Sequence, residues 1–390
     1  MRLKIIFLSF LFAPNGGLLT IALPESSSIH SFQLLLGIVG FIISFDLGFI
    51  KRIKSNTRIL LLFITFILFS SLHRSGYTPD YAAYKIDLLI YNLLMIFLIL
   101  ASIKNYKELR LLILFGAIQI ILGILLKGID LNVYRIGAGE PILAGRLGGL
   151  LLCFSIFYSD RKHLIYRAAF GLLGVLVILL SGTRTVFLAV LIIYLLLQFF
   201  NKDLGKFYLK LKTLRRIIVG VFLISVTLFF ILFRNIFGLS SMLLSRFTGI
   251  ADITRDNDRS VNERFEQWTL AVDMWSDNIL TGVGTGGYGF YYLNWDLRMY
   301  PHNLFLELLS EVGLIGFTLF SIMLYKVWRL LIKRWNYYER HKLNFLISLF
   351  LFGFITSMTS LELPNQYILF LSICLILCVN SIESTRPKIK

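Results

Sequence analysis

Long apolar runs recur along almost the whole of this 390-residue chain, separated mostly by short polar turns. A transmembrane helix needs roughly 17–25 predominantly apolar residues, because it must cross about 30 Å of hydrocarbon with every backbone polar group satisfied internally. A content of 57% hydrophobic and 16% charged residues excludes an ordinary soluble domain. The sequence therefore predicts an all-α polytopic membrane protein with about twelve transmembrane helices, near residues 4–23, 31–50, 59–72, 86–103, 109–126, 142–159, 164–182, 184–200, 214–233, 302–325, 343–361 and 365–381.

The basic residues indicate how these helices are oriented. With the amino terminus in the cytoplasm, 27 of the 39 Lys and Arg residues fall in cytoplasmic turns or at the two termini, as the positive-inside rule requires. We therefore expect a multi-pass protein with both termini in the cytoplasm. The net charge of +17 follows from this topology and from attraction to anionic membrane lipid, so we expect no nucleic-acid partner.

The basic residues left for the outer side differ in kind from those inside. Ten of these twelve are Arg, whereas the cytoplasmic ones comprise fifteen Lys and twelve Arg. A guanidinium group is a planar fork that can bind two phosphate oxygens at once, so this bias predicts an outward-facing anion site. The outer set is Arg74, Lys85, Lys127, Arg135, Arg146, Arg184, Arg234, Arg246, Arg255, Arg259, Arg264 and Arg298.

One outer segment, between Arg234 and Pro301, is too long for a simple connector and is rich in polar and aromatic residues. Loops of this length are usually functional, so we expect a small ordered domain over the membrane face, between helices 9 and 10. The predicted organisation is therefore transmembrane helices 1–5 in residues 1–140, helices 6–9 in 141–234, an outer substrate-binding loop domain in 235–301, and helices 10–12 in 302–390.

Within this outer segment, residues 262–275 space large apolar side chains at helical intervals, which predicts an amphipathic helix on the bilayer surface. A glycine-rich turn follows, in which Gly284, Gly286 and Gly289 formally match a dinucleotide-binding fingerprint. We reject that reading because no strand–turn–helix unit surrounds the turn and no acidic residue follows at the required distance. Asp256 and Asp258 resemble a metal-binding pair, but flanking arginines offset their charge, so we expect neither metal nor cofactor.

The segment Pro301–Gly316 opens the tenth apolar run at its outer end. Glu307 and Glu311 lie four residues apart and so share one helix face, just after His302. Carboxylates that enter a membrane helix are costly unless they pair with cations or face a wet cavity. We therefore expect the two glutamates to pair with the outer arginines, and His302 to belong to the same site.

Three stretches resemble the O-antigen ligase and polymerase superfamily of bacterial inner-membrane proteins. The first is Ser181-Gly182-Thr183-Arg184, with threonine where the family has serine; the second joins Arg264 and Trp268 to Gly282-Val283-Gly284; the third joins His302-Asn303 to Glu311-Val312-Gly313. The resemblance spans roughly residues 140–325. It implies a membrane glycosyltransferase with its active site on the outer face, acting on an undecaprenyl diphosphate-linked glycan.

The resemblance also implies roles for individual residues. Catalysis would fall to His302, Arg264 and Arg184, with the arginines holding the carrier diphosphate and His302 accepting or orienting the acceptor hydroxyl. Substrate binding would involve Arg146, Arg135, Arg246, Glu307, Glu311, Asn303 and Tyr288.

Three readings of the function stay open. A polymerase would join lipid-linked repeat units, which we favour slightly, and a ligase would pass the finished chain to lipid A core or another glycolipid acceptor. A flippase for the same lipid-linked glycan is the rival from another class, although transporters usually place charged sites near the midplane. A chain-length regulator is a further candidate partner.

Overall fold

The computed structural model describes residues 58–72, 80–102, 109–127, 129–130, 135–136, 141–158, 164–200, 259–293, 298–335 and 340–382. In these residues the regular secondary structure is helical except for one short two-stranded ladder. The predicted spans 4–23, 31–50 and 214–233 lie outside the described residues.

Helices occupy the predicted apolar runs that fall in the described part of the chain. They are α5 (Arg58–Leu72), α6 (Asp80–Ser102), α7 (Leu109–Lys127), α8 (Pro141–Phe157), α9 (Leu164–Ser181), α10 (Arg184–Phe200), α15 (Leu304–Trp335), α16 (Arg340–Ser357) and α17 (Tyr367–Ile382). Among described residues, one helix is both long and apolar enough to cross a bilayer, Leu304–Ile332 within α15. The helical class is confirmed, whereas the number of spans and the outer domain stay predictions.

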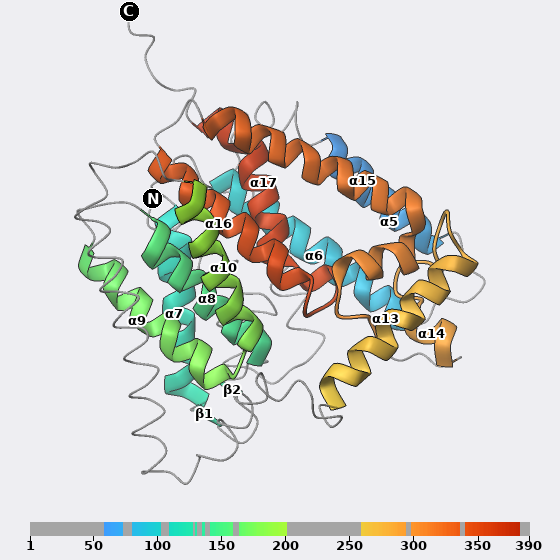
Figure 1. Cartoon of the computed structure of the whole chain (residues 1–390), viewed down its shortest axis with the longest axis horizontal. Coiled ribbons are helices and arrows are strands. Elements are labelled where there is room, and N and C mark those ends of the chain that lie inside the picture. Colours follow the sequence, from blue (N-terminus) through green and yellow to red (C-terminus); the bar gives the residue numbers. More distant parts are fainter. Residues whose placement is uncertain are drawn as a thin grey trace, which may run out of the picture. The chain divides into compact units, whose positions relative to one another are not determined.

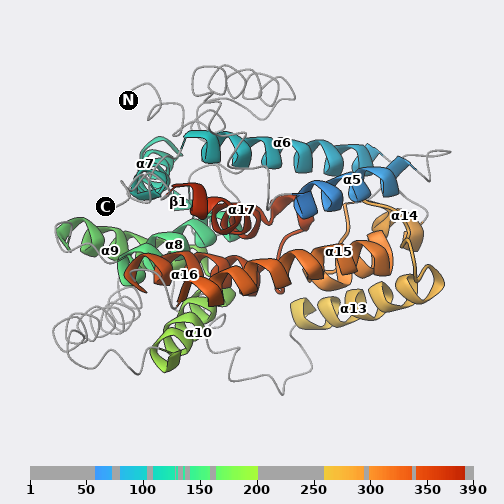
Figure 2. The same ribbon diagram turned by 90° about the horizontal axis from the view of Figure 1, so that it is seen from above.

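The chain divides into two compact units, and most of the described carboxyl-terminal half belongs to the first. This unit contains α5, α6, α15, α16 and α17, together with α13 (Arg259–Asp277), α14 (Tyr288–Leu293) and the 3₁₀ turn η3 (Leu363–Asn365). Helix α15 packs against α5, α16 and α17, and α6 packs against α17 and η3 (Figures 1 and 2). Tyr288 from α14 joins Ala271, Met274 and Val283 in a small core beside α13.

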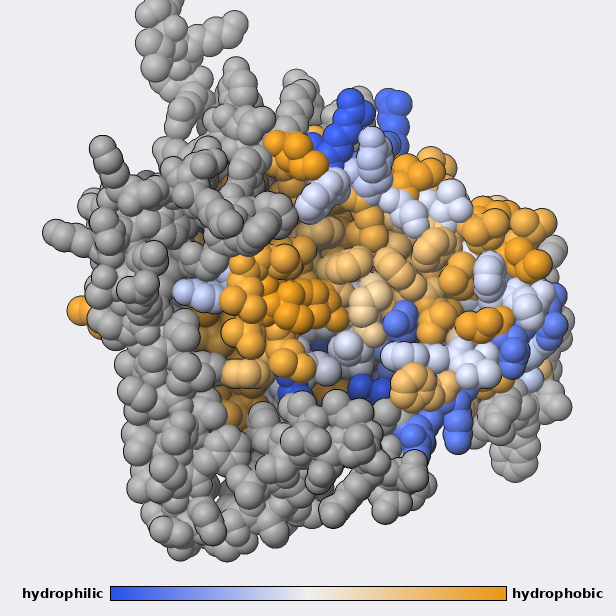
Figure 3. Space-filling model, in the orientation of Figure 1, coloured by the Kyte–Doolittle hydropathy of each residue, from blue (hydrophilic) through white to orange (hydrophobic). Residues whose placement is uncertain are grey.

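The helix α13 coincides with the amphipathic helix predicted from the sequence. Ala271 and Met274 face its small core, whereas Phe265 and Val272 are 58% and 46% exposed. Hydrophobic residues cover much of the described surface in one view, while hydrophilic residues gather over α13 (Figure 3). This distribution suits a helix that lies along a boundary between water and an apolar phase.

The second unit contains α8, α9, α10, most of α7, and the strands β1 (Ile129–Asp130) and β2 (Arg135–Ile136). Helices α8 and α9 approach closely through small residues, as membrane helices often do. A Cβ on Gly148 would lie 2.9 Å from the Gly174 carbonyl oxygen, and one on Gly174 would lie 2.6 Å from the Gly148 carbonyl oxygen. Glycine at both positions therefore allows the two backbones to touch.

Helix α15 is interrupted at Gly313, whose φ of 65° and ψ of −166° are not helical. A neighbouring segment pairs with the backbone groups that the break exposes. The N–H groups of Val283 and Gly284 donate to the Ser310 and Glu311 carbonyls, each at 2.8 Å. In the other direction, Leu314 donates to the Ile279 carbonyl at 2.8 Å, and Ile315 to the Leu280 carbonyl at 3.2 Å. The break is therefore satisfied by the glycine-rich turn of the outer segment.

Glycine is required on both sides of this contact. Gly282 and Gly313 have φ of 66° and 65°, a region that side chains disfavour. A Cβ on Gly282 would lie 2.4 Å from the Glu311 carbonyl carbon, and one on Gly313 would lie 2.4 Å from the Leu280 carbonyl carbon. These glycines thus pack two backbones together, which gives the glycine-rich turn a structural role without a nucleotide.

We expect Gly313→Ala to destabilise the first unit by more than the roughly 1–3 kcal/mol that an unfavourable backbone conformation alone costs. The added Cβ would also push the 279–284 turn away from α15. Thermal unfolding of the purified protein in detergent measures the effect. Ile315→Ala is the matched control, because that side chain is 41% exposed on the same helix. Equal melting temperatures for the two variants would contradict the close-packing account.

Candidate functional site

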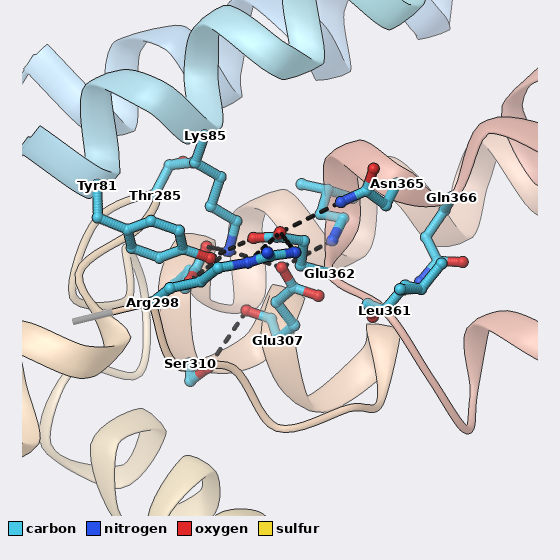
Figure 4. Close-up of polar contacts among 12 residues, drawn as sticks. Tyr81, Lys85, Thr285, Arg298, Glu307, Ser310, Leu361, Glu362, Asn365 and Gln366 are labelled. Carbon is cyan, nitrogen blue, oxygen red and sulfur yellow. Dashed lines mark hydrogen bonds and ion pairs between the residues drawn. The ribbon is translucent and has the colours of Figure 1, made fainter. Parts of the chain in front are cut away.

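A buried ion-pair cluster joins α6 to α15 (Figure 4). The Lys85 ammonium lies 2.6 Å from Glu307 Oε1, and 2.6 and 2.8 Å from the two carboxylate oxygens of Glu311. All three side chains are almost completely buried. A buried charge is tolerated only when it is paired and hydrogen-bonded, so this cluster fixes α6 against α15.

The partner of the two glutamates differs from the expected one. The sequence suggested that Glu307 and Glu311 pair with the outer arginines, but Lys85, from the same outer set, occupies that position. A lysine on α6 can reach both acids because they lie one turn apart on the facing side of α15. Their role in binding substrate stays a prediction.

From Glu307, contacts continue to the turn between α16 and α17. Glu307 Oε1 accepts the Leu363 backbone N–H at 2.8 Å. The neighbouring Glu362 is fully buried, and its Oε1 accepts from Arg298 Nε and Nη2 at 3.1 and 2.8 Å. Tyr81 donates its hydroxyl to the other oxygen of the same carboxylate. Three elements far apart in the sequence therefore converge on Glu362 (Figure 4).

His302 lies just before α15, in a segment with constrained backbone. Its φ of 53° is uncommon for a residue with a side chain. The next residue, Asn303, caps the helix, since its side-chain oxygen accepts the N–H groups of Phe305 and Leu306 at 3.0 and 3.2 Å. The His302 ring lies 4.4 Å from that of Tyr300, and its buried Nδ1 has no hydrogen-bond partner among the described residues.

The α13 helix contacts the same segment. Trp268 donates its indole N–H to the Pro301 carbonyl at 2.9 Å, directly before His302. Arg264 lies one turn earlier on α13, and its charge acts on the imidazole. Burial, followed by the positive charge of Arg264, lowers the pKa of His302 to about 4, although Glu362 opposes the shift and Arg298 adds to it. His302 is therefore neutral at physiological pH.

The other predicted arginines lie elsewhere in the described chain. Arg146 is buried in α8, and Arg184 opens α10 and is half-buried. Both belong to the second unit, where a Cβ on Gly145 would lie only 2.0 Å from the Thr183 hydroxyl. Since Arg146 follows Gly145 and Arg184 follows Thr183, this contact places the starts of α8 and α10 close together.

Three further residues were predicted to bind substrate, and none of them is described next to His302. Arg135 lies in β2 opposite Asp130, and Arg246 lies outside the described residues. Tyr288 is fully buried, and its hydroxyl donates to the Gln267 carbonyl at 2.5 Å, so its surroundings are those of a packed core residue.

Sequence reasoning missed Glu362 and left Arg298 as one cation among twelve. The sequence did hint at a role for Glu362. Two apolar runs are interrupted there by a short turn that contains Glu362, Pro364 and Asn365. The predicted topology puts this turn on the same side as His302. Nothing local in the sequence ties Arg298 to Glu362, since 64 residues separate them.

We expect Lys85→Met to lower the stability of the first unit by about 3–5 kcal/mol, because it leaves two buried carboxylates without their cation. The triple change Lys85→Met, Glu307→Gln and Glu311→Gln should recover part of that loss by removing both charges. Thermal unfolding in detergent tests both variants. Lys326→Met is the control, because Lys326 is exposed on α15. A melting temperature for Lys85→Met equal to that of the control would contradict the role given to the cluster.

Comparison with known proteins adds one match. A family model described as O-Antigen ligase matches residues 168–321, a range that includes Arg184, Arg264, the glycine-rich turn and His302. No match was found among curated proteins.

Proposed function

We propose that this chain, whose residues 168–321 match the O-antigen ligase family, transfers a glycan from an undecaprenyl diphosphate carrier to a hydroxyl group of an acceptor glycan. Family members are glycosyltransferase-like enzymes of polysaccharide synthesis in the bacterial inner membrane. The observation that carries the proposal is the setting of His302. Trp268 of α13 binds the preceding Pro301 carbonyl, and Tyr300 lies between the His302 ring and the Arg298 guanidinium. The outer face of the membrane is the proposed side of reaction.

In the proposed reaction, the acceptor oxygen attacks the anomeric carbon of the donor sugar on the side opposite the carrier. A new glycosidic bond forms, the bond from that carbon to the diphosphate oxygen breaks, and the anomeric configuration inverts. His302 takes the proton of the acceptor hydroxyl. The diphosphate leaves with its bonding electron pair, and its added negative charge is stabilised by Arg264.

No nucleoside triphosphate is needed, because the bond between sugar and carrier is already activated. Fixed guanidinium groups supply the positive charge that a divalent ion provides in other glycosyl transfers, so we propose a metal-independent reaction. The carrier's polyprenyl tail would stay in the bilayer, and the exposed apolar residues of α13, such as Phe265 and Val272, suit that boundary.

A polymerase and a ligase would share this chemistry and differ in the acceptor. We favour a polymerase, with a second lipid-linked repeat unit as acceptor. A ligase would use lipid A core or another glycolipid instead. The flippase alternative is less favoured. His302 lies just before α15 and feels the charge of Arg264 on α13, and this pairing suits bond formation better than passage through the membrane.

The deciding experiment incubates the purified protein, in detergent with EDTA, with an undecaprenyl diphosphate-linked repeat unit, and resolves the products by size. We expect a ladder, which would identify a metal-independent polymerase. Transfer that requires added lipid A core would identify a ligase. If no product forms either with the repeat unit alone or with added lipid A core, glycosyl transfer would be contradicted and the flippase favoured.

The same assay tests whether Arg264 binds the donor diphosphate, a role called the diphosphate clamp below. Arg264→Lys keeps the charge but loses the two-pronged grip, and we expect a loss of roughly 10²–10³-fold in rate, typical of removing one donor to a developing oxyanion. Arg329→Lys, an exposed residue near the other end of α15, is the control. Full activity of Arg264→Lys would remove Arg264 from the clamp.

The pH dependence of kcat/KM should report His302 in the free enzyme. A base works in its unprotonated form, and the pKa of His302 is lowered to about 4. We therefore expect the rate to be flat from about pH 5.5 to 8 and to fall only as the pH drops through about 4. His302→Ala should lose transfer while still binding the lipid-linked donor. An acid limb centred near the ordinary imidazole value of about 6.5 would contradict the electrostatic environment described here.

A further inference from the structure

Arg298 is held by a carboxylate that is itself fixed on every side. Its Nε and Nη2 donate to Glu362 Oε1 at 3.1 and 2.8 Å. Asn365 also donates to that oxygen at 3.2 Å, and Tyr81 donates to the other oxygen of the same carboxylate. Glu362 is fully buried and follows Leu361, whose positive φ of 64° marks a sharply turned backbone. The carboxylate therefore has little freedom to reorient.

This anchoring leaves the Arg298 side chain partly in solvent. It is 42% exposed, whereas its partner Glu362 is fully buried. The guanidinium carbon lies 5.9 Å from the centre of the Tyr300 ring, and that ring lies 4.4 Å from the ring of His302. Arg298 is thus presented at the edge of the site, beside the imidazole on which its charge acts.

We propose that Arg298, positioned by Glu362, is a further anion-binding residue of this site and contacts the diphosphate of the lipid-linked donor. The inference rests on the proposed function, which supplies the diphosphate. A guanidinium pre-oriented by two hydrogen bonds from Nε and Nη2 loses less side-chain freedom on binding phosphate than a mobile one would. Glu362 is a positioning residue, because it acts through Arg298 rather than on the substrate.

A purely structural role for the pair is the competing explanation. In that case Arg298 would only tie residues 298–303 to the turn between α16 and α17, as Asn303 does when it donates to the Met358 carbonyl at 3.3 Å. Loss of such a tie would lower stability. It would not weaken diphosphate binding selectively.

The first test measures binding of glycan-free undecaprenyl diphosphate to the full-length protein in nanodiscs, with undecaprenyl monophosphate for comparison. We expect Arg298→Lys and Glu362→Gln each to weaken diphosphate binding roughly tenfold, the scale of one charge-assisted hydrogen bond. The double variant should bind the diphosphate no more weakly than Arg298→Lys alone, because Glu362 contributes to diphosphate binding only through Arg298. Arg329→Lys should bind like the wild type.

The second test compares the acid limbs of kcat/KM. Three charged groups act on His302, namely Arg264, Arg298 and Glu362. Arg298→Gln removes a positive charge that disfavours imidazolium, so the limb should move to higher pH. Glu362→Gln removes a negative charge that favours imidazolium, so the limb should move to lower pH. These shifts locate both charges beside His302, whereas the binding comparison tests whether Arg298 contacts the diphosphate.

The outcomes separate this inference from the proposed function. If the wild type binds undecaprenyl diphosphate and Arg298→Lys binds it less well, but no transfer occurs, the proposed function fails and the anion site stands. If the wild type transfers glycan and both Arg298 variants bind and react like it, the inference is overturned. Failure of the wild type to bind the diphosphate, or equal losses of diphosphate and monophosphate binding in Arg298→Lys, would also overturn it.

Discussion

The described site depends on the buried ion pairs of Lys85 with Glu307 and Glu311. One cation on α6 neutralises two carboxylates on α15, in surroundings where unpaired charge would be prohibitively costly. Because Glu307 also accepts the Leu363 N–H, the same cluster sets the position of the turn that carries Glu362. Glu362 in turn orients Arg298 beside His302. A rigid electrostatic chain therefore links helices that are distant in sequence to the proposed reacting centre.

The break in α15 is a second constraint on this series of charged contacts. Gly313 interrupts the helix two residues after Glu311, and the turn through Gly282 and Gly284 satisfies the exposed backbone groups. The outer segment is thus joined to the ion-pair cluster by backbone hydrogen bonds, while Trp268 on α13 holds the Pro301 carbonyl. Two spacing patterns that look unrelated along the chain, Gly-Val-Gly and Glu-Val-Gly, are the two sides of one contact.

The sequence predicted what depends on local or periodic signals. Apolar runs located the described helices of the bundle, and helical spacing located α13. The family resemblance grouped Arg264 with His302, and the charge of Arg264 does act on the imidazole, but the roles of the two residues stay a prediction. Contacts that depend on tertiary packing were not predictable in this way. Lys85 was one member of a set of outer cations, and its choice as partner over arginine depends on how α6 faces α15. Glu362 required knowledge of how the α16–α17 turn folds back onto Arg298.

The charges around His302 bear on its proposed role in activating the acceptor. Burial and two nearby cations oppose protonation of the imidazole, and one buried carboxylate moderates them, so His302 is neutral in the free protein. If the donor diphosphate binds beside these cations as proposed, it would offset their effect and raise the pKa of His302. The base would thus become strongest when the donor is in position, so that occupancy by the donor and readiness to accept a proton are coupled by the same arginines.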